Sequence, residues 1–552
     1  MLNVRASDNT PFIVGLSSHP DIDPAGLARL VGSAADFLRD LKAHLPDTDL
    51  RLMVEPCGDA ALGIARAALA LGVSVDALSG AGARADLTSD ARLRCIEVAP
   101  AAAADVLIRR SSLLLALWDG TASREHDDTA DRVFRFLGVR VDRNESVRTI
   151  EIAASPDLDV GVRLVYWVPA VRSGAAPCGH AQPGYLLAAG DNVLDVHGGI
   201  PPSLLGRLAD LNEFNCEYAR FRADGRLTPS ESLLRDLPAQ TAGGDAPLLA
   251  AIDQQYTKAD ALAGHMQWRS DRLFSLFGVM TFAMGFAYLL YDKVTESRLL
   301  LIVYMILLFA GVLAYYLFQG KRWFGKHLSY RALAETLRVR FYLALAGVDR
   351  RMQTQDLIAL TGIDKFHGFS WISYVLHTIE PVAAEARPTG EIYLDRARLV
   401  EQAWVENQYR YYGRKVAQME KESRRVSRLK TVMFLAILVD ISVMFVFGDA
   451  LSRVDARIGM PVKNVVEFCS GFLAVLLGVW ELRHNKMATR ELLWQYRSQL
   501  SQFERARVQL QRKPSRARRE DLLVELGSNS LMEIYLWAIH RYHREHSPPT
   551  AP

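Results

Sequence analysis

Two long stretches of the chain contain only uncharged side chains, most of them apolar. They cover residues 273–291 and 299–318, and a segment of seven residues separates them. Each stretch is long enough to cross about 30 Å of hydrocarbon as a helix. A helix in a globular core normally keeps a polar stripe, which neither stretch has. The pattern therefore predicts a transmembrane hairpin.

A second apolar pair follows at residues 431–447 and 465–482, but it contains carboxylates. Asp440 lies near the middle of its stretch, Glu467 near the start of the next, and Glu481 at its end. A carboxylate exposed to lipid is costly, so such side chains usually face a bundle interior or a water-filled path. We predict a second hairpin and leave two interpretations open. In the first interpretation, Asp440 and Glu467 line a cation path in an oligomer. In the second, Asp440 makes an interhelical hydrogen bond or carries a proton.

Basic side chains gather on one side of both predicted hairpins. Lys and Arg are frequent before the first and third stretches and after the second and fourth, whereas the connecting segments hold few. Because basic residues favour the cytoplasmic side, both hairpins should point outward. We expect a multi-pass membrane protein whose N-terminus, central segment and C-terminus lie in the cytoplasm.

The N-terminal region has a different pattern, in which short apolar runs alternate with segments whose apolar residues have helical spacing. Runs of this length, without polar alternation, are typical of strands buried on both faces. Strands that alternate with helices favour a parallel sheet, so we predict an α/β fold of the Rossmann-like type, followed by an all-α membrane region. The runs are 12–18, 50–54, 112–118 and 164–168, and the first helical segments are 25–44 and 60–71.

Shifts in composition divide the rest of the chain. Residues 330–347 place Glu335 about one turn from both Arg331 and Arg338, which is typical of an ion-paired amphipathic helix. In chain order we expect an α/β domain (1–170), a Gly- and Pro-rich linker with connecting helices (171–250), the first hairpin with amphipathic helices (251–350), a central helical segment (351–430), the second hairpin (431–482), C-terminal helices (483–546) and a disordered tail (547–552).

Composition narrows the classes of function. Lys and Arg total 65 and Asp and Glu total 62 among 552 residues, which gives a net charge of +3. This balance does not favour a protein built around nucleic-acid phosphates, and we expect no direct nucleic-acid binding. Five cysteines without paired spacing are typical of a reducing compartment. The N-terminus lacks a basic start followed by an apolar run, so we expect no cleavable signal peptide.

No common catalytic motif organises the sequence. It contains no Walker loop, no HExxH, no nucleophile elbow and no kinase signature. His540, His543 and His546 lack Cys or carboxylate partners at metal-binding spacing. We therefore expect no catalytic residue, no metal ion and no resident cofactor, although nucleotide hydrolysis by the α/β domain stays open.

Small and polar residues follow the predicted strands of the N-terminal region. These are Gly15, Ser17, Ser18 and His19 at the first run, Trp118, Asp119 and Gly120 at a later one, and Thr129 with Ala130 at a helix start. In these motifs residues 10–170 resemble the SLOG family, a Rossmann-like nucleotide-binding fold. The resemblance implies a ligand site made of Gly15, Ser17, Ser18, His19, Asp119, Gly120 and Thr129. Small residues between a parallel strand and a helix let phosphate approach backbone N–H groups.

The same motifs depart from the family pattern. Ser18 stands where glycine is usual and Pro20 where arginine is usual, and Asp127 and Asp128 replace paired glycines. Two carboxylates repel a phosphate unless a metal ion or a base such as Arg124 intervenes. Two alternatives stay open, a functional pocket and a scaffold that has lost its ligand.

The segments that flank the predicted hairpins resemble the SLATT class of membrane modules, which accompany SLOG domains in bacterial conflict systems. The resemblance rests on residues 254–274, 330–347 and 404–416. It implies an oligomeric effector of the bacterial inner membrane that forms a pore when the α/β domain detects a nucleotide made during phage infection, such as a cyclic oligonucleotide or an ADP-ribose derivative. The alternatives are a membrane-anchored scaffold that binds a protein partner and an enzyme that cleaves a nucleotide at the membrane.

Overall fold

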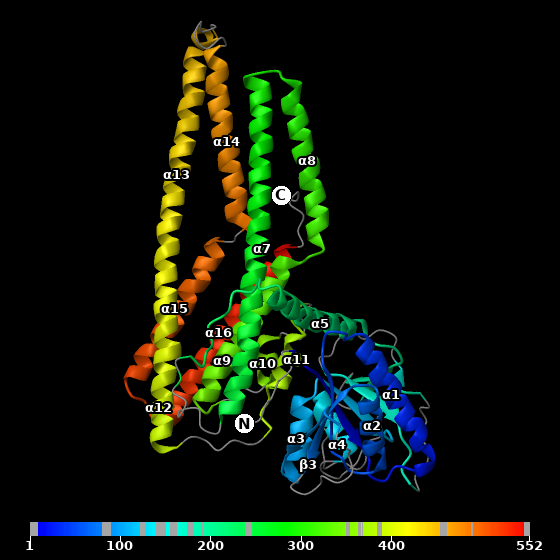
Figure 1. Cartoon of the computed structure of the whole chain (residues 1–552). Helices are drawn as coiled ribbons and strands as arrows, with labels where there is room; N and C mark the ends of the chain where they lie inside the picture. Colours follow the sequence, from blue (N-terminus) through cyan, green and yellow to red (C-terminus); the bar gives the residue numbers. More distant parts are fainter. Residues whose placement is uncertain are drawn as a thin grey trace. The chain divides into compact units, whose positions relative to one another are not determined.

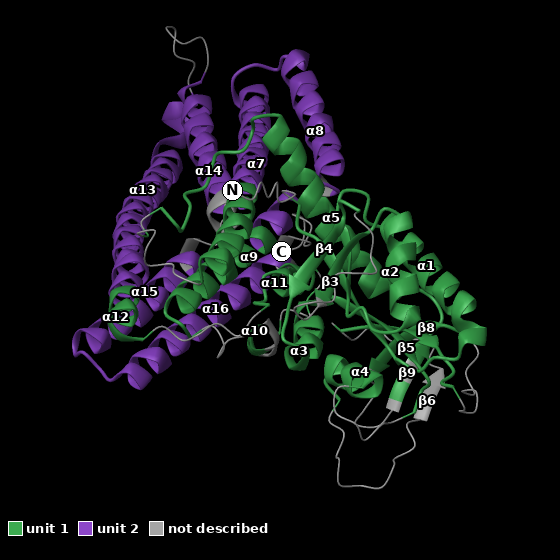
Figure 2. Ribbon diagram, turned by 60° about the horizontal axis from the view of Figure 1, so that its bottom comes forward, with its two compact units in different colours: residues 1–262, 329–397 green, residues 263–328, 398–552 purple. Residues whose placement is uncertain are grey.

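The chain folds into two compact units in a computed structural model (Figure 2). Unit 1 contains residues 1–262 and 329–397, and unit 2 contains residues 263–328 and 398–552. The structure describes residues 9–79, 90–121, 128–139, 151–154, 163–173, 182–188, 193–235, 237, 245–348, 354–362, 366, 368–382, 389–452, 461–486 and 489–545.

A mostly parallel sheet forms the centre of unit 1, which confirms the predicted α/β fold. Among the described residues its nine strands run in the order β4-β3-β2-β1-β5-β7-β8-β9-β6. All neighbours pair in parallel except β8, which is antiparallel to β7 and to β9. The strands are β1 (Phe12–Ser18), β2 (Leu50–Val54), β3 (Ser74–Ser79), β4 (Leu93–Glu97), β5 (Leu113–Trp118), β6 (Glu151–Ala154), β7 (Val165–Pro169), β8 (Gly184–Ala188) and β9 (Val193–His197).

The strand order reverses at β1. Strands β2, β3 and β4 extend the sheet to one side of β1, and β5 and β7 extend it to the other. In open α/β sheets, ligands bind outside the carboxyl ends of the strands at such a reversal. The connecting helices are α1 (Leu27–Ala43), α2 (Asp59–Ala70), α3 (Pro100–Arg110), α4 (Thr129–Leu137) and α5 (Pro202–Ala223).

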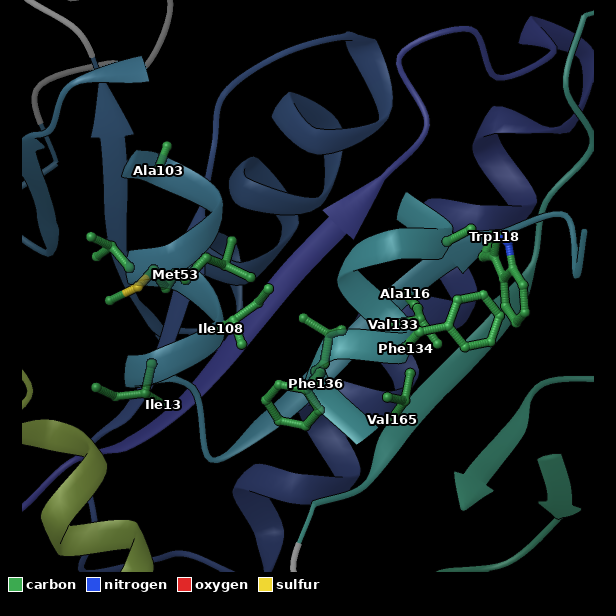
Figure 3. Close-up of a cluster of buried hydrophobic side chains, with 14 of the residues drawn as sticks. Ile13, Met53, Ala103, Ile108, Ala116, Trp118, Val133, Phe134, Phe136 and Val165 are labelled. Atoms are coloured by element: carbon green, nitrogen blue, oxygen red, sulfur yellow. The ribbon is translucent and has the colours of Figure 1, made fainter. Parts of the chain in front are cut away.

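Apolar side chains of β5 anchor the core of the sheet. All six residues of β5 are buried, so the strand has no solvated face. Figure 3 shows Trp118 of β5 beside Phe134 of α4, and their rings meet edge to face at 5.7 Å between centroids. The Trp118 indole N–H donates to the Thr121 carbonyl at 2.9 Å, and the Trp167 indole N–H donates to the Trp118 carbonyl at 2.8 Å. Both buried indoles are therefore satisfied, as buried polar groups must be.

Further helices complete unit 1. They include residues 246–262 of α7 (Ala246–Lys293), residues 329–345 of α9 (Trp323–Leu345), α10 (Thr354–Thr361), α11 (Ile372–Thr378) and most of α12 (Gly390–Val400). The Lys258 ammonium of α7 is 1% exposed and donates to Thr10 Oγ1 at 3.0 Å and to Asn215 Oδ1 at 2.5 Å. This network fixes α7 to the residues just before β1 and to α5.

Unit 2 contains the apolar parts of four helices that are long enough to cross a membrane, which confirms the predicted apolar helices. They are α7, α8 (Arg298–Gln319), α13 (Asn407–Leu451) and α14 (Val462–Lys486), drawn as long helices in Figure 1. Each has an apolar window long enough to cross a membrane, and no more than 6% of any window is buried inside the protein. A surface this apolar is suited to lipid. The π-helix Glu401–Glu406 precedes α13, and α15 (Thr489–Gln511) and α16 (Arg516–Glu545) follow α14.

Candidate functional site

The carboxyl ends of β1 and β5 are neighbours at the strand-order reversal. The sheet register pairs Ser17 with Ala116 and Ser18 with Leu117. The backbone N–H of His19 donates to the Leu117 carbonyl at 3.4 Å. Ser17, Ser18 and His19 therefore lie at the same sheet edge as Asp119 and Gly120, which follow β5.

His19 and Asp119 face each other at this edge. Their Nε2 and Oδ1 atoms are 3.5 Å apart, and the residues are 3% and 8% exposed. Burial lowers the pKa of His19 more than the nearby carboxylate of Asp119 raises it, so the imidazole is neutral at pH 7. The arrangement presents a neutral imidazole next to a buried carboxyl group.

Backbone geometry holds Asp119 in place. Its Oδ1 accepts hydrogen bonds from the Thr121 backbone N–H at 3.0 Å and from Thr121 Oγ1 at 2.8 Å. Gly120 between them has a φ of +80°, a left-handed conformation that glycine adopts without strain. The tight turn after β5 thus fixes the carboxyl group against His19.

Two buried polar atoms at the site have no hydrogen-bond partner among the described residues. They are Ser17 Oγ and His19 Nε2, on residues that are 0% and 3% exposed. An unsatisfied buried polar group costs about 1–3 kcal/mol, so such groups are rare unless they serve a ligand or a function. Both atoms come from the carboxyl end of β1.

Two acidic side chains near the site, Asp21 and Glu55, are paired with arginines. Arg172, which follows β7, contacts the Asp21 carboxylate at 3.0 Å. Arg132 of α4 contacts the Glu55 carboxylate at the end of β2 at 2.8 Å. Sequence reasoning missed both arginines, although Arg172 follows an apolar run just as Asp119 does. Arg124 and Asp127, which that reasoning did consider, lie outside the described residues.

The N-terminus of α4 is already capped by a side chain. Asp128 Oδ1 accepts from the Asp131 backbone N–H at 3.0 Å, and Thr129 is the first helical residue, 3% exposed. A phosphate at this helix end would compete with the Asp128 carboxylate. Thr129 lies on the helix that packs against β5, and its neighbour Asp128 acts on the pKa of His19.

Gly15 lies inside β1, three residues before its end. A Cβ at this position would lie 2.3 Å from Ser111 Oγ and 3.0 Å from a Leu107 methyl group. The Ser111 hydroxyl in turn donates to the Leu107 carbonyl at 2.6 Å. The close approach of α3 to β1 therefore explains the glycine, independently of any ligand.

The carboxylates within the long apolar helices of unit 2 have partners on neighbouring helices. Asp440 of α13 accepts a hydrogen bond from Ser470 Oγ of α14 at 2.9 Å. Glu467 of α14 contacts the Lys293 ammonium of α7 at 2.7 Å. An interhelical hydrogen bond, one of the two interpretations left open for Asp440, is thus present within a single chain.

Comparisons with known proteins assign no family. No protein-family model, no curated protein and no solved structure matches the chain. In the part of the chain that the structure describes, no three His, Cys, Asp or Glu side chains are grouped to hold a metal ion.

Proposed function

We propose that the protein is an effector of the bacterial inner membrane, with both termini in the cytoplasm, which senses a nucleotide-derived signal through the SLOG-like sheet of unit 1. On binding a cyclic oligonucleotide or an ADP-ribose derivative, it oligomerises or opens and permeabilises the membrane through the SLATT-like helices, in anti-phage defence. One observation carries this proposal. Buried, unsatisfied polar atoms lie at the strand-order reversal of a chain that also has four apolar helices.

The chemistry of the sheet edge suits a ligand with both hydroxyl and phosphate groups. A carboxyl oxygen of Asp119 accepts from a hydroxyl group, and Ser17 Oγ and His19 Nε2 supply two further hydrogen-bonding positions. Arg172 and Arg132 offset the nearby carboxylates, which reduces the repulsion of a phosphate. A nucleotide combines these two kinds of group.

The membrane helices provide the second half of the proposal. Asp440 and Glu467 place carboxyl groups inside apolar helices, where polar side chains commonly mark ion paths. In this chain they hold helices together through Ser470 and Lys293. Opening would exchange these interhelical contacts for contacts with water and ions. The ligand would drive that exchange by binding the open state more tightly than the closed one.

Dye leakage from liposomes that contain the full-length protein tests the proposal. The liposomes are scanned against a panel of cyclic oligonucleotides and ADP-ribose derivatives. We expect leakage with one ligand of the panel, its loss in Asp119→Ala, and its retention in Asp36→Ala, a control on a carboxylate whose side chain is 73% exposed. Absence of leakage with every ligand, from protein shown to be folded and inserted, would contradict the proposal.

Asp440 gives an independent test of the membrane part. Asp440→Asn keeps a hydrogen-bonding group for Ser470 but removes the negative charge. We expect normal expression together with an altered ion flux in the presence of the activating ligand. Unchanged conductance would remove Asp440 from the ion path and leave it a structural hydrogen bond.

A membrane-anchored scaffold is the second candidate, and the cap of α4 favours it. Because the Asp128 carboxylate already occupies the helix N-terminus, a phosphate would be bound less strongly there. A scaffold would bind no nucleotide of the panel, and its partner would be recovered with the full-length protein and lost with substitutions at the sheet edge. Nucleotide cleavage is checked in the same samples, by looking for product.

A further inference from the structure

Helices α15 and α16 of unit 2 pack through a polar seam. On α15 it contains Gln495, Gln499 and Gln502, which are spaced by four and three residues and so share one face. On α16 it contains Ser530 and Glu533. Gln499 Nε2 and Gln502 Nε2 donate to Glu533 Oε2 at 2.9 and 3.1 Å. The seam is interior, because Gln499 is 1% exposed and Ser530 is 3% exposed.

The unpartnered polar atoms of the seam are all oxygens. The second carboxylate oxygen of Glu533, the amide oxygens of all three glutamines and the Ser530 hydroxyl oxygen are buried and have no hydrogen-bond partner among the described residues. Each unsatisfied buried polar group is costly, so their concentration at one place needs a physical cause. A group that interacts with several oxygens at once would satisfy them together.

Among the described residues, no basic side chain offsets the carboxylate of Glu533. Burial raises its pKa to about 7, and the side chains of α15 that oppose this rise are Ser498, Gln499 and Gln502. No charged side chain among the described residues acts on the pKa of Glu533. Near neutral pH the seam therefore stabilises either a proton on Glu533 or a positive ion beside it.

We propose that the polar seam binds an alkali cation, Na⁺ or K⁺, through Glu533 and the oxygens of Gln499, Gln502 and Ser530. Carboxylate, amide and hydroxyl oxygens are the ligands that hard cations prefer. A single carboxylate among neutral ligands matches one positive charge, which favours a monovalent ion over a divalent one. Rotation of the terminal amide groups replaces the hydrogen bonds from Gln499 and Gln502 to Glu533 with contacts of the glutamine oxygens to the ion, since oxygen and nitrogen occupy equivalent positions in that group.

The cation competes with a proton for the same carboxylate. At pH 8 Glu533 is available to the ion, whereas at pH 5.5 protonation removes its charge and its affinity for the ion. The cation therefore stabilises the hairpin of α15 and α16 at high pH and loses this effect at low pH. This site does not depend on the function proposed for unit 1.

Thermal unfolding of the full-length protein in detergent tests the site. The midpoint is measured at pH 8 with increasing KCl or NaCl, and choline chloride keeps the ionic strength constant. We expect a saturable rise of a few degrees with one or both alkali ions, and a smaller rise at pH 5.5. The ion that saturates at the lower concentration is the one that the seam prefers.

Two matched variants make the test specific. Glu533→Gln removes the charge from the seam and should abolish the alkali response, whereas Glu504→Gln, on an exposed face of α15, should keep it. If Glu533→Gln does not fold, Ser530→Ala replaces it and should weaken the apparent affinity. A midpoint that follows ionic strength alone, or an alkali response that persists in the seam variants, would overturn the proposal.

Discussion

At the scale of single residues, the buried sheet edge depends on close contacts that tolerate no added volume. Gly15 has the closest such contact among the described glycines, because a Cβ at this position would meet the Ser111 hydroxyl of the α3–β5 connection. Gly15→Ala should destabilise the protein by about 1–3 kcal/mol, since overpacking forces backbone shifts. Chemical unfolding of the full-length protein in detergent measures this.

Gly32→Ala is the matched control for that substitution. A Cβ at Gly32 meets nothing within 4 Å, and the position is inside α1. Alanine there should be neutral or stabilise by about 0.5–1 kcal/mol, because glycine is the poorer helix former. Equal stability of the Gly15 and Gly32 variants would contradict the packing role of Gly15.

His377 makes the stability of the protein depend on pH. Its Nδ1–H donates to the Arg109 carbonyl at 2.7 Å, and burial, followed by Arg163, lowers its pKa to about 3. An unfolded histidine binds its proton near about pH 6.5, so the unfolded state holds more protons between these two values. The free energy of unfolding should fall by up to about 1.4 kcal/mol for each pH unit below about pH 6.5.

Unfolding midpoints of the full-length protein between pH 7 and pH 5 check this prediction. His377→Gln should flatten the pH dependence relative to the wild type. His44→Gln, at a side chain that is 41% exposed, should leave it unchanged. The same slope in the wild type and in His377→Gln would show that the buried imidazole does not carry the effect.

The sequence alone was enough to place Ser17, Ser18, His19 and Asp119 at one sheet edge. Parallel strands bring their carboxyl ends together, so residues that follow two such strands meet without any knowledge of side-chain packing. Arg172 and Asp21 could not be inferred in this way. Their pairing depends on which loops meet after β7 and β1. The spacing of apolar residues does not predict how loops are placed.

At the scale of elements, the apolar runs predicted four of the nine described strands, β1, β2, β5 and β7, and the four long apolar helices. The expected strands at 50–54 and 12–18 are β2 and β1, and the expected ion pairs of Glu335 with Arg331 and Arg338 are present. Strands β3, β4, β6, β8 and β9 were not predicted. Strands β8 and β9 are five residues each, lie among Gly and Pro, and gain their stability from pairing with the sheet, which a local pattern cannot reveal.

Packing of the membrane helices depends on two glycines. A Cβ at Gly285 of α7 would lie 2.6 Å from a Val475 methyl group of α14, and one at Gly471 of α14 would lie 2.6 Å from a Leu289 methyl group. The Phe286 ring meets Phe468 and Phe472 at 5.9 Å beside them. Small residues let membrane helices approach closely, where the hydrophobic effect gives little help.

Gly285→Leu should therefore separate α7 from α14, while Gly278→Leu should not. A Cβ at Gly278 meets nothing within 4 Å. We expect a loss of about 1–3 kcal/mol for the first variant, measured as resistance to unfolding in mixed SDS micelles. If both leucines have the same effect, the contact between α7 and α14 does not hold the helices together.

At the scale of the whole molecule, the chain order interleaves the two units. Residues 329–397 belong to unit 1 although they lie between the two hairpins in sequence, and α7 supplies residues to both units. Lys258 of α7 contacts Thr10 immediately before β1, and the opposite end of β1 holds Ser17 and His19. In the function proposed above, the route from the sheet edge to the apolar part of α7 passes along β1 and through Lys258.

Lys258→Met should weaken that route without changing the sheet edge. The variant removes the hydrogen bonds to Thr10 and Asn215 but keeps a side chain of similar length. We expect ligand affinity close to that of the wild type, with leakage at saturating ligand reduced at least several-fold. Leakage equal to that of the wild type, in protein that binds ligand normally, would show that signalling does not pass through Lys258.

Binding and leakage recorded on the same liposomes decide most directly whether the sheet edge controls the membrane helices. Ligand binding by the full-length protein is titrated while dye release is followed. The ligand concentrations that give half-saturation and half-maximal leakage should agree, and Asp119→Ala should shift both together. Leakage that is independent of bound ligand, or saturated binding in inserted protein without any leakage, would contradict the proposed coupling.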